Sequence, residues 1–318
     1  MSDLPQEKRI IQSTPGYEGK GMRLDHWLTS RFTYRSRTEW QKAIRDSQIL
    51  LNGKKTRPSR ILHGDEIIDF DFGNIEEPPV RTDYSILYEN PHFIAVAKPG
   101  NIPVHPAGRF FNHTLLMLLR KNYGELYVVN RLDRETSGIV LFARSSEAAA
   151  ALSGCLARRE AFKKYIVLVH GDFPQTLDGT GWLSPDTAST IRKKRRFTVE
   201  KPDPLSEDVE DCKTVFNLLE KCGPLSKVEC ILHTGRLHQI RATLCSLGFP
   251  VAGDKLYGVD DTIFSRYADG IMTAQDRENL LYERQALHAW KLEFISPFNG
   301  EKVCFEAPFP DEFQLPVS

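Results

Sequence analysis

The 318-residue sequence lacks the features that would place it among membrane, secreted or zinc-dependent proteins. No apolar run approaches the roughly 18 residues of a membrane-spanning helix, and residues 1–9 are too polar and charged for a secretory signal. None of the six cysteines forms a Cys-x-x-Cys pair, which argues against a zinc site. We therefore expect no metal, no membrane partner, and reduced thiols in a reducing compartment such as the cytoplasm.

Net charge is absent too, because 42 Lys and Arg balance 42 Asp and Glu. The charges are nevertheless unevenly distributed: residues 1–60 hold 13 basic and 6 acidic side chains, whereas residues 65–89 are mainly acidic. Such asymmetry on a neutral chain predicts one basic contact surface. The hydrophobic content of 41% and the charged content of 26% are those of an ordinary globular protein, and the length allows two domains.

Composition and periodicity divide the chain into four parts. Residues 1–20 show no periodicity and are expected to be a flexible lead-in. Residues 21–72 have the pattern of a small α/β unit, and residues 73–84, which contain Pro78-Pro79 and several acids, are predicted to be a linker. Residues 85–318 combine many short strand-like runs with helical segments, which predicts an α+β domain around a mostly antiparallel sheet.

The unit at residues 21–72 is predicted from local signals. Apolar residues between Arg23 and Phe32 recur at helical spacing, residues 36–39 have the form of a capping box, and Asn52-Gly53 is typical of a tight turn. Basic side chains crowd its polar side, which suits phosphate contacts, although a solvated basic face has the same composition. They are Arg31, Arg35, Arg37, Lys42, Arg45, Lys54, Lys55, Arg57 and Arg60.

The most informative stretch is the polar loop at residues 130–138, which lies between two short apolar runs typical of buried strands. Within it, Asp133 is flanked by Arg131 and Arg134. A nearby guanidinium favours the ionised carboxylate. An ionised carboxylate on a loop between rigid strands can act as a nucleophile or a base. A surface ion-pair loop without catalytic function is the alternative.

This loop resembles the catalytic motif of the RluA-type pseudouridine synthases, H-R-L-D-R-x-T-S-G, with Asn130 in place of the first histidine. Residues 234–241, Thr-Gly-Arg-Leu-His-Gln-Ile-Arg, resemble the third motif of that family, from which Leu237 departs. Residues 164–171 resemble its second motif in a loose form. The order of elements in residues 21–72 resembles a small RNA-binding module first known from a small-subunit ribosomal protein.

The resemblance implies the pseudouridine synthase fold and an isomerase that converts uridines in RNA to pseudouridine. Asp133 would attack the anomeric carbon of the ribose or remove a ribose proton. Arg241 would pair with Asp133, and Arg236 is the alternative partner. Tyr165 would stack on the extruded uracil. No cofactor is implied, because the substrate supplies its own leaving group.

The resemblance also implies contacts with RNA by the flanking polar residues of the motifs and of the small module. The predicted substrate is structured RNA, with ribosomal RNA slightly ahead of transfer RNA, and we expect a monomer. The predicted RNA-binding residues are Arg131, Arg134, Arg236, His238, Gln239, Lys164, Arg35, Arg37 and Lys54.

Two other functions fit parts of the sequence. A catalytically inactive RNA-binding or ribosome-assembly protein on the same fold would explain Asn130 and Leu237, but not the retained Asp133 and Tyr165. A hydrolase of the glycosidase type needs a second acid near the first. Glu135 is the acid that the motif offers for that role.

Overall fold

The chain divides into two compact units, residues 1–79 with 106–112, and residues 80–105 with 113–318. The division after Pro79 lies within the predicted linker, whereas no signal in the sequence indicates that residues 106–112 belong with the first unit. The predicted domain bounds stay a prediction. The computed structural model describes residues 10–32, 36–71, 77–107, 110–158, 161–189, 191, 193–202 and 208–313.

The first unit contains a four-stranded antiparallel sheet with the order β1-β4-β2-β3. Its strand β1 pairs with β4, so the expected flexible lead-in is wrong for residues 10–19. A four-residue strand is too short to produce a periodic pattern in the sequence. The elements are β1 (Ile10–Ser13), α1 (Gly16–Gly19), α2 (Leu24–Arg31), α3 (Arg37–Arg45), β2 (Ile49–Leu51), β3 (Lys54–Lys55) and β4 (Ile68–Asp71).

Two local signals in this unit are confirmed. Ser36 accepts the backbone N–H of Glu39, and the Glu39 carboxylate accepts the backbone N–H of Ser36 at 2.6 Å, which closes the capping box of α3. Asn52 and Gly53 have φ angles of 51° and 72°. Two successive positive φ angles are those of a type I′ turn, which joins β2 to β3 in the predicted place.

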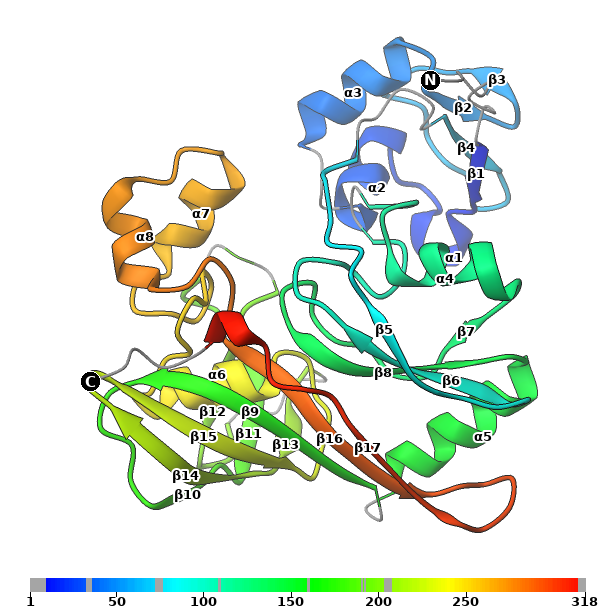
Figure 1. Ribbon diagram of the computed structural model, residues 1–318. Coiled ribbons are helices and arrows are strands. Elements are labelled where there is room, and N and C mark those ends of the chain that lie inside the picture. The colour runs from blue at the N-terminus through cyan, green and yellow to red at the C-terminus, as the bar shows by residue number, and fades with distance from the viewer. Residues whose placement is uncertain are drawn as a thin grey trace, which may run out of the picture. The chain divides into compact units, whose positions relative to one another are not determined.

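The second unit is built around a ten-stranded mixed sheet, seen in Figure 1. Its main path runs β10-β14-β15-β9-β16-β8-β6-β5, while β17 pairs with β16 and β7 with β8. Of the pairings among described residues, that of β8 with β16 is parallel and the others are antiparallel, which confirms the predicted α+β class. The strands are β5 (Ser85–Glu89), β6 (Phe93–Lys98), β7 (Tyr127–Val128), β8 (Ser137–Ala143), β9 (Phe162–His170), β10 (Thr176–Asp178), β14 (Thr214–Cys222), β15 (Leu225–Leu232), β16 (Leu287–Ile295) and β17 (Lys302–Glu306).

Both faces of the sheet are covered around β6 and β8. The neighbouring residues Phe93 and Ile94 of β6 point to opposite faces. Phe93 joins the hydrophobic cluster of α5 (Ser146–Ala157), whereas Ile94 joins that of α4 (Leu115–Tyr123). Coverage on both faces explains why these strands are continuous apolar runs.

Helix α6 (Gln239–Ser246) lies between the large sheet and a second, three-stranded sheet with the order β12-β11-β13. Ile240 and Leu244 pack against the large sheet, and Ala242 packs against the small one. The helix is therefore buried nearly all round and holds its polar side chains rigidly. No pattern in residues 172–211 predicts the small sheet, which consists of β11 (Gly181–Pro185), β12 (Arg195–Thr198) and β13 (Glu210–Cys212).

Two short helices follow α6, namely α7 (Thr262–Ala268) and α8 (Ala274–Leu280), and the 3-10 helix η1 (Asp311–Phe313) comes after β17. Arg266 joins α7 to α8 through an ion pair with Asp276 at 2.5 Å. Among the described residues, no helix has the length and apolar character that crossing a membrane requires.

Candidate active site

Asp133 lies in the loop between β7 and β8, and its carboxylate faces a guanidinium carried by α6. Arg241 Nη1 donates to Asp133 Oδ2 at 2.7 Å, while 31% of the Asp133 side chain stays exposed. Burial alone would raise the pKa of Asp133, but Arg241 and His238 hold that pKa below its ordinary value. The carboxylate is therefore ionised at neutral pH and accessible, as a nucleophile or a base requires.

A second carboxylate holds Arg241 from the other side. Arg241 Nε and Nη2 donate to the two oxygens of the fully buried Asp254 at 2.6 and 2.8 Å. Asp254 Oδ1 also accepts the backbone N–H groups of Leu256 and Tyr257. A bidentate pair fixes the guanidinium plane, so that the remaining Nη1 is directed at Asp133. Sequence reasoning assigned no role to Asp254.

A buried lysine holds the backbone of the loop that carries Asp133. Lys98, at the end of β6, donates to the carbonyl oxygens of Pro99, Ile102 and Arg134 at 2.9, 2.9 and 3.0 Å. These acceptors satisfy all three ammonium hydrogens. Burial, together with the charge of Arg284, lowers the pKa of Lys98. The side chain thus ties the residue after Asp133 to the central sheet.

The loop ends at Ser137-Gly138, where β8 runs beside β16. Gly138 has φ of 115°, and a Cβ there would lie 2.2 Å from the carbonyl oxygen of Ala289, so a larger residue does not fit. Ser137 Oγ contacts His288 Nδ1 at 2.9 Å and accepts a hydrogen bond from Arg284 at 3.2 Å. Close packing of β8 against β16 therefore explains why the motif ends in serine and glycine.

Asn130, which departs from the family motif, fastens the start of the loop to β8. Its Nδ2 donates to the carbonyl oxygen of Ile139 at 3.3 Å, and its Oδ1 accepts the backbone N–H of Leu141 at 2.8 Å. Asparagine therefore serves a scaffolding purpose here, and Asp133 keeps its pairing with Arg241.

A pocket of about 90 Å³ opens beside Asp133. Tyr165, from β9, lines it together with the apolar side chains of Leu132, Leu232 and Leu287. Burial and the negative charge of Asp133 raise the pKa of Tyr165, so the phenol is neutral at ordinary pH. A small pocket with an aromatic wall and one ionised carboxylate suits a planar base attached to a sugar.

His238 approaches Asp133 at its other oxygen. His238 Nε2 lies 3.8 Å from Asp133 Oδ1, and His238 Nδ1 lies 3.0 Å from the hydroxyl of Tyr257. Burial and the charge of Arg241 lower the pKa of His238 to about 4, so the imidazole is neutral near pH 7. The sequence predicts an RNA contact for His238, and the structure adds this contact with the carboxylate.

Arg236 and Gln239 have protein partners. Arg236 pairs with Asp211 at 3.2 Å and with Glu210 at 3.3 Å, so Arg241 rather than Arg236 faces Asp133. Gln239 is buried, and its side chain accepts the backbone N–H of Arg236 at 3.0 Å. Both residues border the pocket, but Gln239 mainly holds the turn that precedes α6.

Three further predicted RNA-binding residues lie in the second unit. Arg131 is exposed and lines the pocket. Arg134 donates to the hydroxyl of Tyr267 at 2.7 Å. Lys164 pairs with Glu229 at 2.9 Å. Their roles in binding RNA stay predictions.

In the first unit, Arg35 lies outside the described residues, and Lys54 is exposed on β3. Arg37 pairs with Asp25 at 3.1 Å. Asp25 has no exposed surface and also accepts from Arg23 and Gln41. Burial alone would raise the pKa of Asp25, but these donors lower it. The carboxylate thus organises the start of α2 and α3.

Glu135, the second acid of the loop, is engaged by cations. Lys255 Nζ lies 3.1 Å from both of its carboxylate oxygens, and Arg134 lies 3.1 Å from one of them. A general acid for glycoside hydrolysis must hold a proton that it can release. An ion-paired carboxylate between two cations is poorly suited to that, which weighs against the hydrolase alternative.

Comparison with known proteins gives a consistent result. The family described as RNA pseudouridylate synthase matches residues 92–246. The chain is 30% identical over 318 residues to the uncharacterized RNA pseudouridine synthase YlyB of Bacillus subtilis, covering 95% of either protein. It is 30% identical over 327 residues to the ribosomal large subunit pseudouridine synthase D of Xanthomonas campestris, covering all of this chain and 95% of the relative. The solved structure of human RNA pseudouridylate synthase domain containing 1 matches with a TM-score of 0.57 and 25% identity over 73% of this chain and 86% of that one.

Fold and site therefore define an isomerase that acts on RNA. The chain belongs to the RNA pseudouridine synthase family. The family, the fold and the enzyme class predicted from the sequence are confirmed. The roles of individual side chains and the identity of the RNA stay predictions.

Proposed function

We propose that this enzyme isomerises specific uridines of structured RNA, with Asp133 as the catalytic carboxylate. The observation that carries the proposal is the 2.7 Å ion pair between Asp133 and Arg241 at the edge of a pocket lined by Tyr165. The arginine keeps the carboxylate ionised and oriented, and the pocket beside it has room for a base but not for a duplex.

In the proposed reaction, the bond between N1 of uracil and C1′ of the ribose breaks, and a bond between C5 and C1′ forms. Asp133 either attacks C1′ to give an ester that the turned uracil displaces, or removes the C2′ proton to give a glycal that regains it. In both routes C5 finally loses its proton to solvent, and N1, released from C1′, takes one up. All other atoms of the substrate are retained, so the reaction requires no external group donor.

Tyr165 is the proposed stacking partner of the base. A uridine within a helix cannot reach a recessed carboxylate, so it must be flipped out of its stack. A base–aromatic stack contributes roughly 1–3 kcal/mol, which offsets part of the unstacking energy. The ring of Tyr165 lines the same pocket as Asp133, as such a stack requires.

We propose ribosomal RNA of the large subunit as the substrate, ahead of transfer RNA. The full-length similarity to the Xanthomonas relative supports this choice, because that protein is named for the large subunit. Exposed cations of the first unit, such as Lys54 and Lys55, suit contacts with phosphates. Phosphate contacts do not read sequence, so we expect selection of the uridine to depend on RNA shape and the loop that presents it.

The test is tritium release from RNA labelled at C5 of uridine, with total RNA from cells that lack the gene. We expect release by the wild-type enzyme and none by Asp133→Asn. Mapping of the product then names the RNA, and a modified transfer RNA would overturn the ribosomal assignment. Equal release by both proteins would show that Asp133 is not the catalytic group. Tight RNA binding without release by either protein would favour an inactive binding protein.

A further inference from the structure

His238 occupies a backbone conformation that is uncommon for residues other than glycine. It is the residue that precedes α6, its φ is 56°, and its side chain does not cap the helix. The left-handed region costs a non-glycine residue roughly 1–2 kcal/mol. Strain of this kind is kept at sites where the side chain has a task. The geometry of the side chain indicates the task.

The imidazole is a bridge between Asp133 and Tyr257. Only 13% of the His238 side chain is exposed, and its two ring nitrogens face different partners. Nε2 lies 3.8 Å from Asp133 Oδ1, and Nδ1 lies 3.0 Å from the Tyr257 hydroxyl. The rings of His238 and Tyr257 meet edge to face, with centroids 5.5 Å apart, which restricts rotation of the imidazole.

The partners of Tyr257 decide which ring nitrogen carries the proton. The backbone N–H of Arg195 donates to the Tyr257 hydroxyl at 2.8 Å, and burial raises the pKa of Tyr257, so the hydroxyl keeps its own hydrogen. That hydrogen is then free to be donated to His238 Nδ1. Donation of that hydrogen to Nδ1 places the imidazole proton on Nε2, where it faces Asp133 Oδ1. The other tautomer would turn a lone pair towards a carboxylate.

We propose that His238 is a positioning residue for Asp133, held as its Nε2–H tautomer by Tyr257. Arg241 then fixes one oxygen of the carboxylate and His238 the other. The inference rests on the proposed function, in which Asp133 reacts with the ribose. The distance of 3.8 Å is longer than a hydrogen bond. We expect it to shorten when the uridine enters, as catalytic contacts commonly do.

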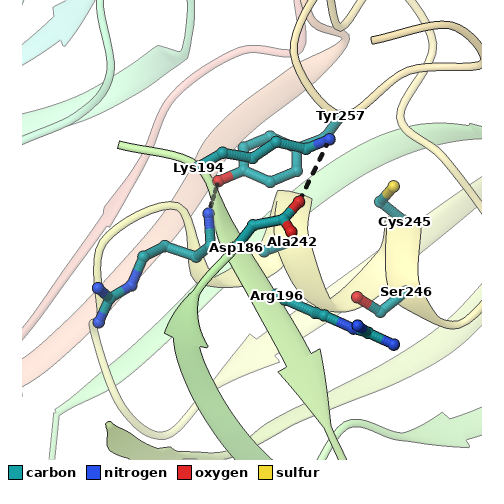
Figure 2. A pocket seen from close by; sticks show the side chains of 8 residues that line it. Asp186, Lys194, Arg196, Ala242, Cys245, Ser246 and Tyr257 are labelled. Carbon is teal, nitrogen blue, oxygen red and sulfur yellow. Dashed lines mark hydrogen bonds and ion pairs between the residues drawn. The ribbon is translucent and has the colours of Figure 1, made fainter. Parts of the chain in front are cut away.

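The contacts that orient Tyr257 begin in the small three-stranded sheet, outside the pocket that Tyr165 lines. Arg195 opens β12, and its guanidinium pairs with Glu210 at 3.2 Å. Its neighbour Lys194 pairs with Asp186 beside Tyr257, as Figure 2 shows. These ion pairs hold the backbone N–H that orients Tyr257. Residues 192–196 are five consecutive cations in the sequence, and two of them, Lys194 and Arg195, are thus used within the protein.

The first test compares His238→Gln with His238→Met in the full-length enzyme. The two replacement side chains have similar lengths, and both residues must adopt the same left-handed backbone conformation at position 238. Only glutamine places an N–H near Asp133. We expect His238→Met to lower kcat roughly 10- to 100-fold with little change in KM, and His238→Gln to restore most of it. Thermal unfolding midpoints of the two variants check that folding is equal.

The second test is a double-mutant cycle with Tyr257→Phe. A phenylalanine at position 257 cannot donate to His238 Nδ1, so the imidazole is no longer held as its Nε2–H tautomer. We therefore expect kcat to fall when Tyr257→Phe is the only change. In the His238→Gln background the amide needs no tautomer, so the same change should have a clearly smaller effect. Additive effects of the two changes would overturn the inference, and so would equal kcat values of His238→Gln and His238→Met.

Asp133→Asn separates failure of the inference from failure of the proposed function. Should Asp133→Asn retain tritium release, the proposed function is wrong, and the inference falls with it. Should Asp133→Asn be inactive while His238→Met keeps the wild-type kcat, Asp133 stays catalytic and only the positioning role of His238 is refuted.

Discussion

The substitution Asp254→Asn tests whether the two carboxylates that bind Arg241, those of Asp254 and Asp133, have different roles. The substitution keeps the volume, but Asp254 Oδ1 already accepts the backbone N–H groups of Leu256 and Tyr257. The new amide NH₂ must therefore face the Nε–H of Arg241, where Asp254 Oδ2 accepts at 2.6 Å in the wild type. One charge-assisted hydrogen bond, worth about 1.5–3 kcal/mol, is lost, and two donors oppose each other.

We expect Asp254→Asn to lower the free energy of unfolding by about 3–4 kcal/mol, since breaking a buried ion pair costs about 3–5 kcal/mol. In a unit of this size the midpoint of thermal unfolding should fall by about 6–15 °C. Calorimetry or urea unfolding followed by tryptophan fluorescence measures the change. The guanidinium also loses its fixed plane, so tritium release should decrease.

Asp133→Asn is the matched control, because it makes the same chemical change at the other end of Arg241. Its side chain is 31% exposed, and Asp254 still holds the guanidinium, so stability should change by less than about 1 kcal/mol. Activity should nevertheless be lost. Equal destabilisation by the two variants, or wild-type stability of Asp254→Asn, would refute this division between a structural and a catalytic carboxylate.

Three further predictions concern other parts of the molecule. Gly138→Ala should destabilise the second unit by more than about 3 kcal/mol, because its Cβ would lie 2.2 Å from a backbone oxygen. As a control, the Cβ of Gly154→Ala in α5 would meet nothing within 4 Å, so this change should be neutral or stabilise by about 0.5–1 kcal/mol. Similar midpoints of thermal unfolding for the two variants would contradict the packing argument. Because the pKa of Asp133 is depressed in the free enzyme, kcat/KM should hold as the pH falls and be lost only as the pH drops through that lowered pKa, beneath the range of an ordinary aspartate. An acid limb above the ordinary aspartate range, with the fold intact by circular dichroism, would contradict the ion pair. Lys54→Gln should raise KM without changing kcat and reduce the slope of log affinity against log salt by about 1, measured by filter binding, whereas an unchanged slope would exclude a phosphate contact.

Short-range patterns proved sufficient for much of the fold. The capping box of α3, the Asn52-Gly53 turn and the strands on either side of the loop at residues 130–138 depend on residues within a few positions of one another, and each is confirmed. Elements without such patterns were not predictable. Strand β1 has four residues, and the small sheet β11–β13 depends on packing against α6 rather than on its own periodicity.

The candidate site divides in the same way. The motifs that contain Asp133 and Arg241 predict an ion pair between these two residues, and the structure contains that ion pair. The partners beyond it could not be read from spacing, because Asp254, Tyr257 and Lys98 reach the site through the tertiary fold. The Gly-Asp dipeptide at residues 253–254 was the available signal for Asp254. Its meaning depends on the burial of the carboxylate, which the sequence does not display.

The bond between Arg241 and Asp133 joins positions 108 apart along the chain. Closing a contact of that separation is slow, because the intervening strands must pair first. Secondary structure and much of the hydrophobic core can therefore return during refolding before any catalytic centre exists. Recovery of turnover would then be a late marker of refolding, and a chain trapped without β9 and β15 in place would bury Trp27 and Trp40 of the first unit and still be inert.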